Sequence, residues 1–507
     1  MPGLFFVALV TVPLEKRMAH HNGRSSARRI LALCAGLTLS TAAAVEGCAD
    51  DDADAVHAQP ESLPFSRPLQ DTNPDPNLVE VQLVAALGKQ RYLQDGDASV
   101  WGYRDGTAND ARVMVPGPLL ELEQGQHVII HFTNELPEGT TIHWHGLPVP
   151  NASDGTPSVQ MEVEPGGSFD YEFEANTAGT FWYHPHLHSD EQIERGLYGP
   201  IVVRGGVVPP VDQDRVFVLD DVKLNASGTL SESTTQLDVM LGRQGNVILA
   251  NGARNRQLRV RPGARERWRF INAANGRYFN LRLPGHRFDV IGWDGGLLSE
   301  PYTTDTLLIT PGERYEVLVE FPDTAGSQLA LQTVYYDRGH DIPDVGPKTV
   351  FEIEVTGKTS HAKELPEQWG ELAELEPPTA ALERKLELSE AMPEAEEFAV
   401  FRINGKEFPD VPAIEAHLGD VETWSIYNNS EMDHPFHLHG AFFRVLDVDG
   451  MPLEHSGWKD TVNVPRKQTL RFAVRYGERG TWMYHCHILE HAERGMMGVL
   501  KLSESNN

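Results

Sequence analysis

Cysteine is scarce in this sequence, since its 507 residues include only Cys34, Cys48 and Cys486. Once an N-terminal export signal is removed, the folded body keeps only Cys486, which excludes a fold held together by internal disulfides. Basic residues are also few, with 43 lysines and arginines against 73 aspartates and glutamates, and the formal charge is −30. Such an acidic chain repels phosphate backbones, so we expect no nucleic-acid partner. Beyond the N-terminal segment no run is apolar enough to cross a bilayer.

The first 48 residues carry the features of an export signal. An apolar stretch over residues 30–37 follows Arg28 and Arg29 and leads into small residues, a pattern too short for a membrane span. The arginine pair resembles a twin-arginine signal, which exports prefolded proteins. Cys48 precedes an aspartate-rich spacer and is a candidate lipid-attachment cysteine, although Glu46 departs from the small residue usual there. We therefore expect an exported protein of the periplasm or cell envelope, with Cys48 as its only candidate membrane anchor.

Glycine and proline are plentiful, with 45 and 34 residues, and they separate short β-rich runs. One plan occurs three times: a strand, a glycine turn, a second strand and a loop that carries an asparagine, at Asn134, Asn272 and Asn428. A period of about 150 residues is too long for a solenoid and predicts an all-β chain of three tandem β-sandwich domains. We place an export signal at 1–48, a polar tether at 49–75, the domains at 76–206, 212–357 and 381–507, and an interdomain linker at 358–380.

Ten of the 21 histidines are concentrated in four short segments. Two segments fall in the first predicted domain and two in the third, whereas the middle domain has none. Lone histidines such as His286 and His340 we interpret as ordinary hydrogen-bonded side chains, and His188 as a surface residue. That interpretation fails for histidines placed symmetrically in the first and last repeats: His143 and His145, His184 and His186, His434 with His437 and His439, and His485 and His487 with His491.

The His-x-His spacing indicates a cluster of several metal ions. In a strand, residues i and i+2 point to the same face and lie about 6–7 Å apart. A rigid pair is therefore badly placed to chelate a single ion, but it can offer one imidazole to each of two neighbouring ions. Four pairs supply eight imidazoles to a multinuclear cluster, and imidazole suits copper.

Cys486 lies between two of these histidines, so in a strand its sulfur points to the opposite face and serves a different metal. A thiolate with two imidazoles and a weak methionine ligand is typical of a blue-copper electron-transfer site. His434 is the spare histidine of its segment, and His491 and Met496 follow the cysteine. The covalent link from Cys486 to its two neighbours then joins the blue site to the cluster.

Three-domain multicopper oxidases, in particular the laccase-like bacterial type, carry four copper motifs that this chain resembles over residues 76–507. The resemblance rests on the runs His143-Trp144-His145-Gly146, Trp182-Tyr183-His184-Pro185-His186, His434-Pro435-Phe436-His437-Leu438-His439-Gly440 and His485-Cys486-His487-Ile488-Leu489-Glu490-His491. It implies three cupredoxin-like Greek-key sandwiches and four copper ions, one of type 1, one of type 2 and two of type 3.

The resemblance also implies which residues hold each ion. These are His434, Cys486, His491 and axial Met496 for type 1; His143 and His437 for type 2; His145, His184 and His487 for one type 3 ion; and His186, His439 and His485 for the other. Met497 is a weaker axial candidate, because the family spacing selects Met496.

The activity implied by the resemblance couples four one-electron oxidations of small reducing substrates, such as phenols and aromatic amines, to the reduction of dioxygen to water. We expect electrons to enter through the exposed edge of His434 or His491 and to pass through Cys486, which we regard as catalytic. A monomer is expected.

Proton delivery is assigned by the same resemblance to Asp154, our second catalytic residue, near the type 2 copper. The alternative is an ordinary turn residue, because Asp-Gly is a common turn pair. Related enzymes often carry a further acid where this chain has Ala492, so Glu490 or Glu493 are the available substitutes.

The alternative within the family is a periplasmic cuprous-ion oxidase that serves copper tolerance. Such relatives often carry a methionine-rich insertion, but residues 341–380 contain no methionine and the chain has only 11. Glu431, Met432 and Asp433, beside His434, keep this alternative open because they could bind a metal ion. An electron-shuttle protein needs only the blue site, and a copper nitrite reductase lacks the paired type 3 motifs.

Overall fold

The computed structural model describes residues 62–93, 96–108, 112–207, 209–366, 369, 382–393 and 398–504. The predicted export signal, with Cys34 and Cys48, lies outside the described residues, as do residues 49–61 of the predicted tether and most of the predicted linker after residue 366. Among the described residues the chain forms 31 strands, three α-helices and one 3-10 helix, so the all-β prediction is confirmed. None of these helices is long and apolar enough to span a membrane.

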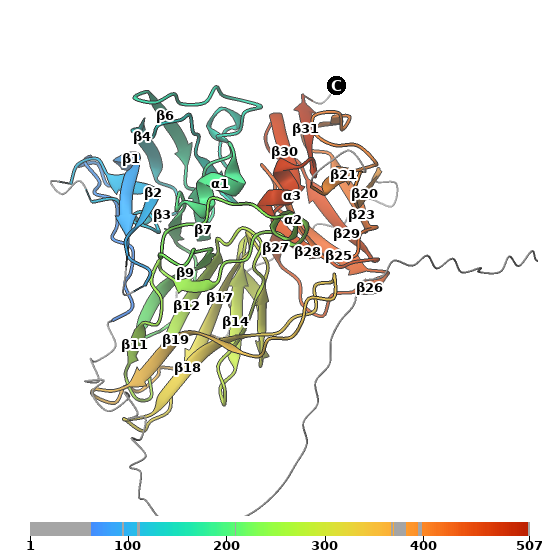
Figure 1. Ribbon diagram of the computed structural model, residues 1–507. Helices are drawn as coiled ribbons and strands as arrows, with labels where there is room; N and C mark the ends of the chain where they lie inside the picture. The colour runs from blue at the N-terminus through green and yellow to red at the C-terminus, as the bar shows by residue number, and fades with distance from the viewer. Residues whose placement is uncertain are drawn as a thin grey trace, which may run out of the picture. The chain divides into compact units, whose positions relative to one another are not determined.

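The strands form six sheets, two in each of three consecutive parts of the chain (Figure 1). In the first part, the strand orders are β2-β1-β4-β6 and β3-β8-β7-β5. The strands are β1 (Leu78–Gln90), β2 (Ala98–Asp105), β3 (Leu120–Glu123), β4 (His127–Asn134), β5 (His143–His145), β6 (Ser168–Glu174), β7 (Gly179–His184) and β8 (Gly199–Arg204).

The second part contains the sandwich of strands β9 to β19, coloured green to yellow-orange in Figure 1. Its sheets have the orders β10-β9-β12-β17-β14-β15 and β11-β19-β18-β13-β16. The strands are β9 (Gln213–Val222), β10 (Val247–Ala250), β11 (Gln257–Val260), β12 (Arg265–Asn272), β13 (Phe279–Arg282), β14 (Phe288–Trp293), β15 (Gly296–Thr304), β16 (Leu307–Ile309), β17 (Arg314–Glu320), β18 (Gln328–Val334) and β19 (Lys348–Val355).

The third part repeats this arrangement with the orders β21-β20-β23-β29-β25-β26, where β27 also pairs with β25, and β22-β31-β30-β24-β28. The strands are β20 (Glu383–Ala391), β21 (Val400–Ile403), β22 (Ile414–His417), β23 (Val421–Asn428), β24 (His434–Leu438), β25 (Phe443–Val448), β26 (Met451–Pro452), β27 (Trp458–Lys459), β28 (Thr461–Val464), β29 (Thr469–Arg475), β30 (Gly480–Cys486) and β31 (Met497–Ser503). The limits of the three domains stay predictions.

Each part has its own apolar core, because buried and less buried positions alternate along its strands. Strand β4 alternates partly buried and buried residues over its whole length, and β23 follows nearly the same pattern. Three large clusters of buried side chains result, one for each pair of sheets. Residues 62–75, predicted as part of the tether, lie against this body: the Leu63 amide donates to the Gln257 carbonyl at 3.0 Å, and its side chain is buried in the second core.

The repeated asparagine has the same structural role in all three parts. Asn134, Asn272 and Asn428 each end a strand, are fully buried, and donate from Nδ2 to two backbone carbonyls at 2.7–2.9 Å. The Oδ1 atom of each asparagine accepts a hydrogen bond from the backbone amide two residues later in the chain. A buried amide with these bonds pins the following loop. In the first and third parts that loop leads into the histidine strands β5 and β24.

Short helices follow the other two histidine segments. Helix α1 (Ser189–Glu194) comes after His186, and α3 (Leu489–Glu493) comes after His487. The Ser189 amide and hydroxyl both donate to Glu493 Oε1, at 2.8 and 2.7 Å, which ties α1 to α3. Two further short helices are α2 (Gln236–Leu241) and the 3-10 helix η1 (Asn151–Ser153). His188 precedes α1 and is exposed, in keeping with its interpretation as a surface residue.

Candidate metal centres

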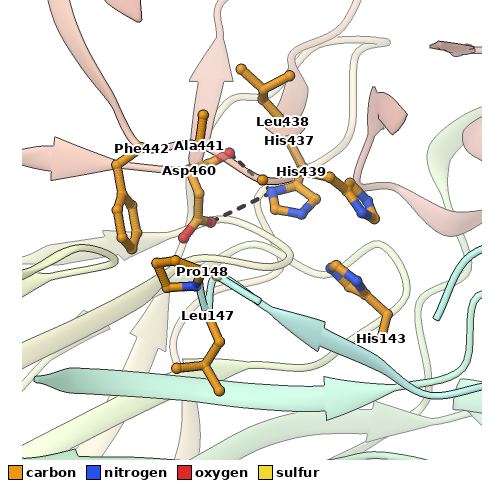
Figure 2. A pocket seen from close by; sticks show the side chains of 11 residues that line it. His143, Leu147, Pro148, His437, Leu438, His439, Ala441, Phe442 and Asp460 are labelled. Carbon is orange, nitrogen blue, oxygen red and sulfur yellow. Dashed lines mark hydrogen bonds and ion pairs between the residues drawn. The ribbon is translucent and has the colours of Figure 1, made fainter. Parts of the chain in front are cut away.

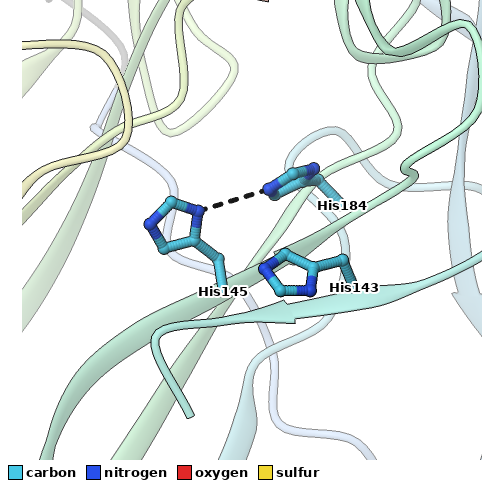
Figure 3. Close-up of side chains that lie close together, drawn as sticks. All are labelled: His143, His145 and His184. Carbon is cyan, nitrogen blue, oxygen red and sulfur yellow. Dashed lines mark hydrogen bonds between the residues drawn. The ribbon is translucent and has the colours of Figure 1, made fainter. Parts of the chain in front are cut away.

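Eight histidines from the first and third parts of the chain meet in one buried cluster. Figure 3 shows His143, His145 and His184 of strands β5 and β7 gathered together, and Figure 2 shows His143 facing His437 and His439. His485 Nε2 lies 3.2 Å from both His186 Nε2 and His439 Nε2. The eight side chains are His143, His145, His184, His186, His437, His439, His485 and His487, none more than 7% exposed.

The imidazoles are oriented as metal ligands are. His143 donates from Nδ1 to the Asp154 carbonyl at 2.8 Å, and His437 donates from Nδ1 to the Asp460 carbonyl at 2.9 Å. The Nε2 atoms of both rings have no hydrogen-bond partner, and neither nitrogen of His487 has one, although all are buried. Unpaired buried nitrogens are costly unless an ion occupies the space between them. These residues therefore fit a metal cluster.

Burial keeps these rings neutral, which is the protonation state that binds metal. It lowers the pKa of His186 to about 3, and the pKa of His145 and His485 well below the ordinary value. Nearby imidazoles add to the effect, because each disfavours a charge on its neighbour.

The predicted ligand sets can be compared with the grouping of these atoms. His186, His439 and His485 converge as a set, as the resemblance implied. His145 Nδ1 and His184 Nε2 are 3.4 Å apart, and the ring of His487 lies 4.9 Å from that of His145. The rings of His143 and His437, the predicted type 2 pair, lie 5.8 Å apart. The structure thus brings together every histidine assigned to the cluster.

A second set of donors lies on the other side of strand β30. Cys486 Sγ is 3.5 Å from His434 Nδ1 and 3.7 Å from His491 Nδ1, and the two nitrogens are 3.1 Å apart. All three side chains are fully buried. Burial raises the pKa of the Cys486 thiol, so only a bound cation would hold it as the thiolate.

The register of β30 and β31 separates the two methionines. Met497 pairs with His485 and therefore shares its face of the sheet, where it packs with Met483. Met496 lies in the same buried cluster as Cys486, whose amide donates to the Met496 carbonyl at 3.0 Å. Met496 is therefore on the side of the cysteine, as the predicted axial position requires.

Asp154 lies directly against two histidines of the cluster. His439 Nδ1 is 3.1 Å from Asp154 Oδ2, and His143 Nδ1 is 3.2 Å from Asp154 Oδ1. Burial opposes ionisation of this carboxyl, but His439 and His143 lower its pKa below the ordinary value. The residue is therefore more than a turn former, because its carboxylate orients two rings.

A second buried carboxylate at the cluster, Asp460, was not predicted from the sequence. Its Oδ1 lies 3.1 Å from His145 Nε2, and Arg314 donates to Oδ1 and Oδ2 at 2.7 and 2.5 Å. Arg314 and the hydrogen bonds of the two histidines hold the pKa of Asp460 well below its ordinary value in spite of burial. Asp460 stands between β27 and β28 without any histidine in its own segment, so no local pattern marks it.

Arg314 connects all three parts of the chain. It belongs to β17 of the middle sandwich, contacts Asp460 of the third, and donates from Nε to the Thr180 carbonyl of the first at 3.1 Å. Its amide donates to Asp294 Oδ1 at 2.8 Å, and Asp294 Oδ2 lies 3.2 Å from Lys459 Nζ. The middle sandwich supplies no histidine to the cluster, but it supplies the cation that holds Asp460.

The expected exposed edge for electron entry is absent, so that prediction is wrong. His434 and His491 are both fully buried. The Ser430 hydroxyl lies 2.8 Å from His434 Nε2, and the Met240 carbonyl of helix α2 lies 3.3 Å from His491 Nε2. The physical reason is that α2, which comes from the middle part of the chain, packs over His491, while Ser430 of the loop before β24 covers His434.

Glu490 and Glu493 were the candidates to replace the acid that relatives often carry at the position of Ala492. Both carboxylates accept hydrogen bonds from other parts of the protein. Glu490 is buried and accepts from Asn275 Nδ2 at 2.9 Å, while its Oε2 has no partner and burial raises its pKa. Glu493 Oε1 accepts the two bonds from Ser189 described above. Neither carboxylate contacts an imidazole of the cluster within hydrogen-bonding distance.

Comparison with known proteins agrees with this geometry. Three family models described as multicopper oxidase match residues 96–207, 218–338 and 377–506. The chain is 30% identical over 444 residues to a multicopper oxidase of Staphylococcus haemolyticus, covering 83% of this chain and 88% of that protein.

Solved structures show the same relationship. A multicopper oxidase from Campylobacter jejuni, described as a metallo-oxidase, superposes with a TM-score of 0.79 at 30% identity, covering 88% of this chain and 96% of the other. A laccase-like oxidase from Ochrobactrum, described as acting on lignin model compounds and lignosulfonate, superposes with a TM-score of 0.73 at 29% identity, covering 87% and 100%. The chain therefore belongs to the multicopper oxidases, copper-dependent oxidoreductases that use dioxygen as the electron acceptor.

Proposed function

We propose that this chain is a laccase-like oxidase, which takes single electrons from small organic reductants such as phenols and aromatic amines and reduces dioxygen to water. The observation that carries the proposal is the pair of buried donor sets on the two sides of β30. Cys486 belongs to one set, and its covalent neighbours His485 and His487 lie among the cluster histidines. One chain segment thus joins a site for one-electron exchange to a cluster that can collect several electrons.

We further propose that four copper ions occupy these sets. His434, Cys486, His491 and Met496 hold one ion, and the eight clustered histidines hold three. Bound copper supplies the redox chemistry, while the protein supplies fixed ligand geometry and excludes bulk water. Asp154 and Asp460 between them hold one nitrogen of each of four rings, so that the other nitrogen stays available to the cluster: His143, His439, His145 and His437.

The residues just before His434 bear on which class of substrate the protein oxidises. Asp433 accepts at both oxygens, from Tyr336 and Asn463 at Oδ2 and from the Arg466 amide at Oδ1. Met432 is fully buried, and Glu431 pairs with Lys467 at 2.8 Å. Of these three candidates for a cuprous-ion site, Asp433 is engaged at both oxygens and Met432 is buried, so only Glu431 is open to solvent. Organic reductants are therefore favoured, and cuprous-ion oxidation remains the second candidate because a solved relative is described as a metallo-oxidase.

The two candidates differ in their response to added copper. We expect a fully copper-loaded preparation to oxidise 2,6-dimethoxyphenol at a rate that free Cu(II) changes by less than about twofold, since only Glu431 of these three residues is open to solvent and a single carboxylate is a weak site. Steady-state oxygen uptake with the phenol, and separately with Cu(I), measures this. A steep rise of phenol oxidation with free Cu(II), together with fast Cu(I) oxidation, contradicts the proposal and supports the second candidate.

Asp154 is proposed to carry protons to the cluster as well as to orient its rings. We expect Asp154→Asn to leave reduction of the blue site by substrate nearly unchanged, because the Asp154 carboxylate contacts His143 and His439 of the cluster and no ligand of the Cys486 site. Reoxidation by dioxygen should slow about tenfold or more, the usual effect of losing an acid–base group. Stopped-flow reoxidation of the fully reduced protein measures this.

The control for Asp154 is Asp154→Glu, which keeps a titratable carboxyl and should recover part of the reoxidation rate. Copper content must be equal in all three proteins, since the two histidines also depend on this carboxylate for orientation. Reoxidation of Asp154→Asn at the wild-type rate would show that protons reach the cluster by another route.

We also propose export to the periplasm or cell envelope, on the basis of Arg28 and Arg29 before the apolar stretch. Replacing both arginines with lysine keeps the charge but removes the twin-arginine pattern. We expect unprocessed protein to accumulate in the cytoplasm, measured by fractionation and the mass of the mature N-terminus. Normal export of the lysine variant would point to the general secretory route.

A further inference from the structure

Electron entry needs a docking place, because neither ligand ring of the blue site reaches the surface. The outer nitrogens of His434 and His491 face Ser430 and Met240, and both rings are fully buried. A reductant must therefore bind one layer further out. The side chains that contact Asp433, the residue before His434, form the next shell outward from the blue site.

Two tyrosines of the middle sandwich reach Asp433 from outside. Tyr336 donates from its hydroxyl to Asp433 Oδ2 at 2.6 Å, and the Tyr278 hydroxyl donates to the Asp433 carbonyl at 3.2 Å. The two rings are stacked, with centroids 5.8 Å apart and planes 10° from parallel. The Asp433 carbonyl belongs to the peptide bond that joins Asp433 to His434. A path from the outer face of the tyrosine pair to His434 therefore runs through Tyr278, one hydrogen bond and that peptide bond.

A cavity of about 90 Å³ opens to solvent on that outer side. It lies mainly against the loop between β18 and β19, and Val345 of that loop is 69% exposed at the rim. Both tyrosines line it, which supplies aromatic surface for a ring.

The same cavity holds a buried cation with a free donor. Arg338 lines it and is only 2% exposed. Its Nη1 donates to the Gly276 carbonyl at 2.8 Å and its guanidinium lies 5.3 Å from the centre of the Tyr278 ring, but its Nη2 has no hydrogen-bond partner. A planar guanidinium with an unused donor is suited to a carboxylate.

We propose that this cavity, lined by Tyr278, Tyr336 and Arg338, is the docking site for aromatic reductants that carry a carboxylate, such as phenolic acids. The inference rests on the proposed function and names its substrate class and subsite. The ring lies against the tyrosines, and the carboxylate accepts from Arg338 Nη2. The overall charge of −30 opposes anions at long range, but salt screens distant charges beyond about 8 Å, so the local contact decides.

The first experiment measures binding without turnover. The copper-loaded protein is titrated calorimetrically with 3,4,5-trimethoxybenzoate, which has no phenolic hydrogen, and with the neutral 3,4,5-trimethoxybenzyl alcohol. We expect the benzoate to bind about tenfold more tightly, as for a charge-assisted hydrogen bond. Val345→Glu should weaken benzoate binding about tenfold by repulsion at the rim, and Arg338→Gln should remove the preference for the acid.

The matched control is Leu87→Glu, which places the same charge on β1 at a residue 59% exposed and should change neither affinity. A second measurement compares turnover of 4-hydroxy-3,5-dimethoxybenzoate with that of 2,6-dimethoxyphenol. We expect Val345→Glu to lower the ratio of kcat/KM for the acid to that for the neutral phenol about tenfold.

Equal affinity for benzoate and alcohol, or unchanged benzoate affinity in both Val345→Glu and Arg338→Gln, overturns the inference. Such a result leaves the proposed function intact if phenols are still oxidised. Conversely, failure to oxidise any phenol contradicts the proposed function, and the titrations still decide whether the cavity binds aromatic acids.

Discussion

Replacing Cys486 with serine is expected to abolish the intense blue absorption and to stop turnover completely. The cysteine sulfur is the only thiol among the donors assigned to this site, and it lies 3.5 Å from His434 Nδ1 and 3.7 Å from His491 Nδ1. A hydroxyl cannot supply the thiolate-to-copper charge transfer that gives blue sites their colour and their redox behaviour. The residue also makes the shortest covalent link between the donor sets, since His485 and His487 are its direct neighbours, so its loss interrupts electron delivery as well.

Visible absorption and oxygen uptake measure this result, and copper content must be determined in parallel. The Cys486→Ser protein should retain copper at the eight-histidine cluster, because those rings lie on the other side of β30. Met496→Leu is the matched control, since it should keep the blue absorption and change only the redox potential of the site. A serine variant that stayed blue would overturn the assignment of Cys486.

Replacing Arg314 with methionine is expected to lower the free energy of unfolding by about 3–5 kcal/mol, the usual result of removing one partner of a buried ion pair. Arg314 and Asp460 are fully buried, with the guanidinium donating to both carboxylate oxygens. Methionine leaves Asp460 and Asp294 without their shared cation. The loss should also disturb His145, which Asp460 contacts, so copper content at the cluster should fall.

Denaturant unfolding of the metal-free protein measures the stability, and copper analysis with electron paramagnetic resonance measures the cluster. Arg314→Lys tests geometry, because it keeps the charge and loses the two parallel hydrogen bonds. Arg287→Met is the matched control: its pair with Asp305 is 59% and 81% exposed, so the change should stay within about 0.5 kcal/mol. An Arg314→Met protein as stable as wild type would show that Asp460 is held by other groups.

The sequence by itself determined the all-β class and the threefold plan, because both depend on local patterns. A strand alternates buried and exposed residues with a period of two, and the asparagine of each repeat recurs at the same point. The same period of two assigns Cys486 to the face opposite His485 and His487 from spacing alone. The family followed from the same segments, since the spacing within each histidine motif is a local property.

Only the tertiary structure decided which groups surround those ligands. Arg314 and Asp460 are 146 residues apart, and their contact exists because the middle sandwich packs against the third. The burial of His491 likewise depends on helix α2, whose Met240 lies 251 residues earlier in the chain. Buried charge pairs and covered surfaces arise from packing between distant segments, and no spacing along the chain encodes them. The surroundings of His434 and His491, through which a reductant must deliver its electrons, are therefore set by the tertiary structure alone.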